Sequence, residues 1–209
     1  MRNTKRVIAQ FTFFDRTGIQ GFLEKQAKKG WMLEKISSYG WKFRRIEPQK
    51  INFAVTYFPQ ASMFDPEPSE KQKSFWELCE HTGWKLVSHN AQMQIFCNEK
   101  ENPVPIETDP QTELETIEKS AQKSYLISYW LLVACSVLQM MIGVWQFFTH
   151  PVEYLSRNSS LFSALCWSIV LAMFLMEIIG YFSWRKKARK AIEETGSFTS
   201  TKGYRNIQL

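Results

Sequence analysis

The sequence predicts an α+β protein in which a duplicated β-α-β-β soluble domain, with a mainly antiparallel sheet, precedes a two-helix transmembrane hairpin. Two observations carry this prediction. The N-terminal half alternates strand and helix patterns, and it does so twice. The C-terminal half contains two long apolar runs, Tyr125–Phe148 and Ser160–Phe182, the first of which holds no charged residue. At 1.5 Å per residue, a helix as long as the first run extends about 36 Å, enough to cross a bilayer core.

The first repeat begins with a β-branched and aromatic segment at Arg6–Phe14 that is typical of a strand. Thr17 and Gln20 have the spacing of a capping box, so we expect a helix from there to Gly30. Strands follow at Trp31–Ser37, at 39–44 and at Ile51–Tyr57, where apolar and polar residues alternate.

The second repeat has the same order of patterns. Ser69 and Gln72 form another capping box, and the helix that follows places Phe75, Leu78 and other apolar residues on one side. Gly83 ends this helix, and segments 84–88 and 92–97 have the pattern of a closing hairpin.

The two repeats align at a shift of 53 residues, which brings Phe22 onto Phe75 and Phe43 onto Phe96. The shift also superimposes the Gly-Trp pairs at 30–31 and 83–84. We therefore expect two related units at about 6–46 and 50–98 within a domain 1–98, sharing one sheet with two helices on one face.

The remaining segments are assigned by composition. Residues 99–124 are expected to form a polar linker and a juxtamembrane helix that starts at Pro110, after Asp109. That helix is expected to continue without a break into the first span, 125–148. A loop at 149–159, the second span at 160–182 and a basic tail at 183–209 follow.

A short set of residues resembles a known family. Lys28–Leu33 (KKGWML), the Tyr-x-Trp-x-Phe strand at 39–43 and the Ile-x-Phe-x-Val-x-Tyr strand at Ile51–Tyr57 look like bacterial proteins of domain-of-unknown-function family 2812. A second Gly-Trp-x-Leu at Gly83–Leu86 fits too, so the resemblance covers about residues 6–98. It implies a membrane-tethered cytoplasmic domain in Gram-positive bacteria, and a link to a PadR-like transcription regulator. It implies no catalytic residue.

The charges predict a bacterial cell membrane location with both termini in the cytoplasm. The net charge of +6 is concentrated in Arg185–Lys190 and the residues after it, directly behind an apolar run. Lys119 and Lys123 flank the first span, whereas Arg157 is the only Lys or Arg in the loop. This cluster is typical of a membrane flank rather than of a nucleic-acid site. No apolar leader follows Met1, so we expect no signal peptide.

Candidate contacts in the membrane lie in the second span. Ala164, Ser168 and Ala172 recur every four residues, with Gly180 two turns later, a spacing that lets helices approach closely. They either pack inside the hairpin or contact a second copy or a partner's helix. Glu177 carries the only charge in either span. It either extends to the interface or has a buried role in partner contact or proton handling.

The soluble half offers weaker candidates. Cys79, His81, His89 and Cys97 match no zinc spacing, so we expect no metal and no cofactor. The tryptophans are expected mainly in the core. Tyr39, Trp41 and Arg44 are the candidates for contact with a ligand or partner on a helix-free sheet face.

No motif for a nucleophile elbow, P-loop, zinc protease or dinucleotide site is present, so catalysis is not expected. The sequence favours a membrane-anchored sensory or regulatory adaptor that binds a protein or small ligand. The alternative is an accessory subunit of a membrane transporter, because two spans are too few to form a pathway alone.

Overall fold

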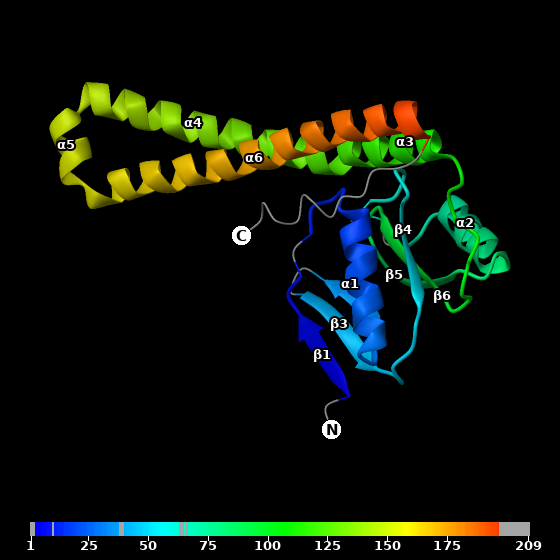
Figure 1. The fold of residues 1–209 in the computed structure, drawn as a ribbon. Helices are drawn as coiled ribbons and strands as arrows, with labels where there is room; N and C mark the ends of the chain where they lie inside the picture. The colour runs from blue at the N-terminus through cyan, green and yellow to red at the C-terminus, as the bar shows by residue number, and fades with distance from the viewer. Residues whose placement is uncertain (1–2, 10, 38–39, 63–64, 66, 197–209) are drawn as a thin grey trace. The chain divides into compact units, whose positions relative to one another are not determined.

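The computed structural model describes residues 3–9, 11–37, 40–62, 65 and 67–196 (Figure 1). The chain divides into two compact units. One comprises residues 1–120 together with 188–209, and the other comprises 121–187. The first unit therefore includes the linker that we expected to be separate, and also the end of the last helix.

The first repeat contains β1 (Thr4–Val7), α1 (Arg16–Lys28), β2 (Trp31–Ser37) and β3 (Gly40–Arg45). The second contains β4 (Asn52–Tyr57), α2 (Glu70–His81), β5 (Lys85–Asn90) and β6 (Met93–Asn98). The β-α-β-β order predicted for both repeats is therefore confirmed. The predicted first strand is too long, because the chain leaves the sheet after Val7.

The strands form two antiparallel three-stranded sheets, in the orders β1-β3-β2 and β4-β6-β5, rather than the one sheet predicted. β2 and β5 lie against each other where the sheets meet, and the Ile36 amide donates to Ser88 Oγ there at 3.2 Å. Both sheets shift register at equivalent places, between Leu33 and Lys35 and between Leu86 and Ser88. These matching irregularities lie 53 residues apart, as the duplication predicts.

The helix starts differ in how well the sequence predicted them. Ser69 caps α2 by accepting from the Gln72 amide at 3.3 Å, as expected. α1 begins earlier than the Thr17 capping box suggests, because buried Asp15 accepts from the Gly18 amide at 3.0 Å. A Cβ on Gly18 would lie 2.3 Å from that carboxylate, so only glycine allows this cap.

The core of the first unit lies between α1, both sheets and α2. α1 packs against β2 and β4, and it buries Ile19, Leu23 and Ala27. Cys79, Trp84 and Phe96 form a buried cluster in the second repeat. Leu78, expected on the apolar side of α2, is instead exposed.

The first unit also contains α3 (Pro110–Ser120) and the final turns of α6 (Asn158–Thr195). The second unit contains a π-helical stretch, η1 (Ala121–Leu126), then α4 (Ile127–Thr149), α5 (Pro151–Ser156) and most of α6. α4 and α6 run antiparallel, with α5 in the turn between them (Figure 1). The predicted loop 149–159 therefore contains a short helix.

Two helices are long and apolar enough to cross a membrane, Pro110–Thr149 and Ser159–Thr195. Their outward-facing side chains are large and apolar, including exposed Leu131, Trp145 and Phe162. The helix from Pro110 continues to Thr149 as expected, although η1 interrupts its α-helical geometry. A π-helical insertion of this kind rotates the faces of the helix on its two sides.

Candidate functional site

The candidate site is the junction at α3, where two buried glutamates lie on either side of an apolar stripe. Leu114 and Ile117 form the stripe, and they are 6% and 1% exposed. Glu113 and Glu118 flank it and are 6% and 7% exposed, which is unusual for carboxylates. Buried charges need partners, so each glutamate identifies a contact of α3.

Glu113 contacts the folded domain. Its Oε1 forms an ion pair with Nη1 of Arg16, the first residue of α1, and both side chains are largely buried. Asp15 fixes the start of α1 through its cap, and this places Arg16 at the helix end that meets α3. The ion pair therefore joins α3 to the capped first turn of α1.

Burial dominates the electrostatics around Arg16. Desolvation lowers the pKa of Arg16, and the nearby Glu107 and Tyr57 partly oppose that effect. Desolvation likewise raises the pKa of Glu107, while Arg16 opposes the shift. Burial raises the pKa of Tyr57, whose hydroxyl donates to the carbonyl of Phe13. The linker, α1, β4 and α3 thus share one polar cluster beneath the domain surface.

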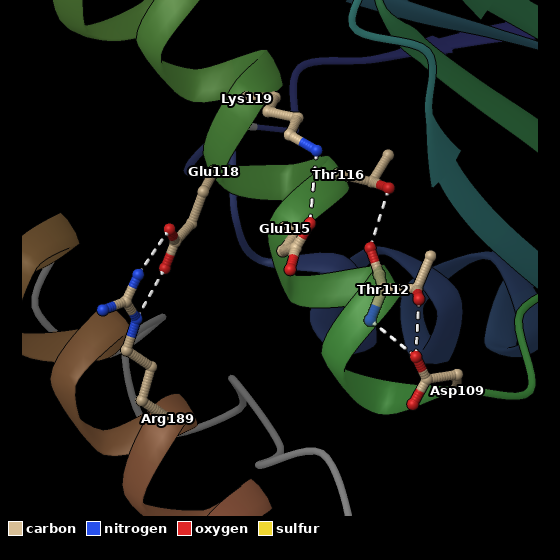
Figure 2. A network of polar contacts seen from close by, with 7 residues as sticks. All are labelled: Asp109, Thr112, Glu115, Thr116, Glu118, Lys119 and Arg189. Carbon is tan, nitrogen blue, oxygen red and sulfur yellow. Dashed lines mark hydrogen bonds and ion pairs between the residues drawn. The ribbon is translucent and has the colours of Figure 1, made fainter.

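Glu118 makes the second contact of α3. Arg189 of α6 reaches it in a bidentate pair, with Nε 3.0 Å from Oε1 and Nη2 2.8 Å from Oε2 (Figure 2). Next to Arg189 on α6, Ala188 is fully buried and Ile192 nearly so. Because a bidentate arginine pair fixes both distance and orientation, it sets the register of these two helices.

The start of α3 is well defined. Asp109 accepts a hydrogen bond from the amide of Thr112 at 3.0 Å (Figure 2). It also accepts one from the amide of Gln111 at 3.3 Å, which confirms the predicted cap. The hydrogen bonds from Thr112 lower the pKa of the Asp109 carboxyl. On the exposed side, Lys119 pairs with Glu115 at 3.2 Å. α3 is therefore capped at its start and paired through Glu113 and Glu118.

Glu177 lies within the hairpin and has an intramolecular partner. The Tyr125 hydroxyl donates to Glu177 Oε2 at 3.3 Å, and the Tyr125 ring lies 4.3 Å from that of Tyr129. The carboxylate is half-buried among these aromatic rings. The structure thus places Glu177 between α6 and the start of the first apolar helix.

The small residues of α6 do not form one continuous contact. Ala164 and Ser168 line a hollow opposite α4, together with Gln139 and Gly143. Ala172 is exposed, and nothing lies within 4 Å of the position that a Cβ on Gly180 would take. Only the first half of the predicted stripe faces α4.

The surface placement of Trp41 is wrong. Its ring is buried and lies 5.4 Å from Phe11 and 6.0 Å from Phe22, so it faces α1. The alternation in β3 was correct, but the aromatic face is the one that α1 covers. Arg44 lies on the opposite face and is exposed, and Tyr39 lies outside the described residues. Contact of Arg44 with a partner stays a prediction.

That opposite face of the first sheet is basic. Arg6 and Lys35 both pair in register with Lys42, and Arg44 lies two residues further along β3. Lys42 also forms an ion pair with Glu34 at 2.6 Å. We call Arg6, Lys35, Lys42 and Arg44 the basic face. Like charges directly opposite one another destabilise a sheet, so sheet stability does not explain this arrangement.

Sequence reasoning missed this asymmetry because the soluble half is nearly neutral as a whole. Residues 1–50 hold twelve Lys and Arg against four Asp and Glu, whereas residues 51–120 hold five against twelve. The opposite net charge of these two stretches was the available signal. The ion pairs of Glu113 and Glu118 gave no such signal, because Arg16 and Arg189 are distant from them in the sequence.

The cysteines and histidines of the domain do not form a cluster. Cys79 and Cys97 are buried, whereas His81 and His89 are exposed, and His89 stacks on Trp76 at 5.2 Å. Among the residues that the structure describes, no group of three or more His, Cys, Asp or Glu side chains is arranged to hold a metal ion.

These features define a class: an α+β protein with two β-α-β-β repeats, joined through a charged helical junction to two helices long enough to span a membrane. The chain belongs to the family described as "Protein of unknown function (DUF2812)", whose model matches residues 15–130. The match runs from the cap of α1 through α3 into α4, so the family region includes the junction. No curated protein and no solved structure matches the chain.

Proposed function

We propose that this chain is a membrane-anchored regulatory adaptor, in which α3 couples a cytoplasmic partner-binding domain to a transmembrane hairpin. The observation that carries the proposal is that both buried glutamates of α3 form ionic contacts, Glu113 with Arg16 and Glu118 with Arg189. A simple tether needs no buried charges, because apolar packing of similar volume holds a helix at least as well. Buried ion pairs fix register, which is what a coupling helix requires.

Cytoplasmic placement of the domain is supported by the distribution of charge. Lys119 and Lys123 precede the first apolar helix, and Arg185–Lys190 follows the second, against Arg157 at the opposite end. By the positive-inside rule, this distribution supports a cytoplasmic location for both termini. Protease protection of a C-terminal epitope in intact and opened vesicles tests this orientation.

The partner surface in this proposal is the basic face of the first sheet. Its four cations lie on adjacent strands and are not covered by α1, so an acidic protein segment complements them. A photocrosslinking residue at Thr4, beside Arg44 in register, should capture a partner from native membranes. Reversing Lys42 and Arg44 to Glu should abolish capture, whereas reversing Lys71, an exposed cation on α2, should not.

The identity of the captured protein separates the two functional classes. A soluble regulator supports the adaptor, whereas a polytopic transport protein would make the chain an accessory subunit instead. Capture that survives reversal of Lys42 and Arg44 would mean that the basic face is not the partner surface.

Coupling is tested by a flexible Gly/Ser insertion between Ser120 and Ala121, where the two compact units divide. This variant should insert and fold normally but lose regulated partner capture. The same insertion between Glu101 and Asn102, in the exposed linker before α3, is the matched control. It should retain capture, because Arg16 and Glu113 still fix α3 to the domain. Equal behaviour of both insertions would contradict coupling through α3.

A further inference from the structure

A cavity of about 480 Å³ lies between α4, α5 and α6, at the end of the hairpin where the chain reverses. Its volume falls within the range of small-molecule sites. All of its lining belongs to the compact unit 121–187. Apolar residues of α4, including Met140, Val144 and Phe147, form one wall, whereas polar side chains from all three helices form the rest.

Gly143 lies on the wall of the cavity, in the middle of α4. A Cβ at this position would lie 3.2 Å from Tyr154 Oη, so a small side chain would shift that hydroxyl by a few tenths of an ångström and a large one would fill part of the cavity. The Tyr154 ring also packs edge-on against Phe147, with centroids 6.0 Å apart. Glycine weakens a helix interior, and here it keeps both the space and the position of the hydroxyl.

The amides of Gln139 and Gln146 lie on the same side of α4 as Gly143 and line the cavity. Neither side chain has a hydrogen-bond partner among the described residues, whereas nearby serines do. The hydroxyl of Ser136 donates to the carbonyl of Leu132, and that of Ser168 to the carbonyl of Ala164, both at 2.8 Å. Both glutamines are exposed, so their amides are open to hydrogen-bond a polar group that enters the cavity.

Arg157, just after α5, is the only charged residue in the cavity lining, and no ion pair within the described chain involves it. Glu153 and His150 instead line a smaller adjoining hollow of about 160 Å³, which shares Arg157 and Tyr154 with the cavity. A guanidinium that has no ion pair among the described residues and that lines the same hollows as a tyrosine favours an anionic group.

We propose that this cavity binds an amphipathic anion, and that this anion is what the adaptor senses. The acidic group contacts Arg157 and Tyr154, the glutamine amides bind polar atoms deeper in the cavity, and the apolar part lies along Phe147. This ligand assignment rests on the proposed membrane-spanning hairpin, because it requires the cavity to open at the membrane surface opposite the domain. It adds a ligand class to the proposed function.

The test uses the full chain in nanodiscs of zwitterionic lipid, with decanoate as the probe. Decanol and decyltrimethylammonium are the uncharged and cationic comparisons, and calorimetry measures their affinities. Decanoate should bind about tenfold more tightly than decanol, because a hydrogen bond to a charged group is worth about that factor. Arg157→Gln should remove this preference. Lys186→Gln, which removes a cation outside the cavity, should leave it unchanged.

Filling the cavity supplies a second variant. Gly143→Leu should abolish binding of decanoate, and if it fails to fold, Ser163→Leu narrows the cavity from α6 instead. Equal affinities for the three amphiphiles would mean partition into lipid and would overturn the proposal, as would a preference that survives Arg157→Gln. Protease protection separates the two proposals. If the chain spans the bilayer but does not bind decanoate, only the ligand assignment is wrong. If the chain does not span the bilayer, both the ligand assignment and the proposed function are wrong.

Discussion

Arg189 forms two hydrogen bonds to Glu118, from which it is 71 positions away in the sequence. Glu118 is nearly buried, whereas the Arg189 side chain is 53% exposed. The guanidinium therefore approaches from solvent to satisfy a carboxylate that packing has already desolvated. The stability of this helix pair should depend more on the arginine than its exposure suggests.

Arg189→Gln should lower the free energy of unfolding of the first unit by about 1–2 kcal/mol, because it removes the charged, bidentate hydrogen bonds to the buried Glu118 carboxylate. Urea denaturation of the full chain in mild detergent, followed by tryptophan fluorescence, measures the change. Lys190→Gln is the matched control. It breaks an exposed pair with Glu194 at 3.5 Å and should cost no more than about 0.5 kcal/mol. Equal losses would show that Glu118 is not desolvated.

The Arg16–Glu113 pair should behave as a buried pair in a double-mutant cycle. Arg16→Met or Glu113→Leu alone should destabilise the domain by about 3–5 kcal/mol, because each removes one member of a largely buried ion pair. The double variant should regain most of that loss. A double variant that is as unstable as the sum of the two single variants would mean that the groups do not interact.

Glu107 should make the stability of the domain depend on pH. Burial raises its pKa above the ordinary value of 4.5, so the charged form opposes folding. The destabilisation is fully present above the folded-state pKa and is relieved as the pH falls through that pKa towards 4.5. Glu107→Gln should therefore stabilise the domain at pH 7 and give no advantage below about pH 4.5. Denaturation at several pH values measures this difference. A constant advantage, or a loss at pH 7, would contradict burial of the carboxylate.

The thiols of the soluble domain should be unreactive while it is folded. Burial raises the pKa of Cys79 to about 11, and it raises the pKa of Cys97 as well. At pH 8 a maleimide should therefore leave Cys79 and Cys97 unmodified until urea unfolds the domain. Mass spectrometry of peptides reads both sites. Labelling of Cys79 in the absence of urea would show that the α2 cluster opens readily.

Much of the fold follows from local patterns. The Gly30 and Gly83 positions have φ angles of 78° and 93°, so the glycines that end α1 and α2 are required by backbone geometry and were visible in the sequence. The repeat order, the Ser69 cap and the Asp109 cap were predictable for the same reason. Each depends on a few neighbouring residues.

The errors arise where tertiary contacts decide. The prediction placed Trp41 and Arg44 together on a helix-free face, although period-2 alternation puts them on opposite faces of β3. Which face α1 covers depends on packing, and so Trp41 was misplaced. Asp15 outcompeted Thr17 as the cap because Gly18 makes room for its carboxylate. The partners of Glu113 and Glu118 were not predictable, since no local pattern joins α3 to Arg16 or Arg189.

The central claim is that α3 makes the domain and the hairpin move as one. Spin labels at Lys28 on α1 and Ser128 on α4, both exposed, test this in a chain whose Cys135 and Cys166 are replaced by alanine. Double electron-electron resonance in nanodiscs should give one narrow distribution of distances between the two labels. It should broaden when Arg16 and Arg189 are both changed to Gln, and remain narrow when Lys190 is changed instead. A distribution that is broad in the unaltered chain, or unaffected by losing both arginines, would contradict coupling through α3.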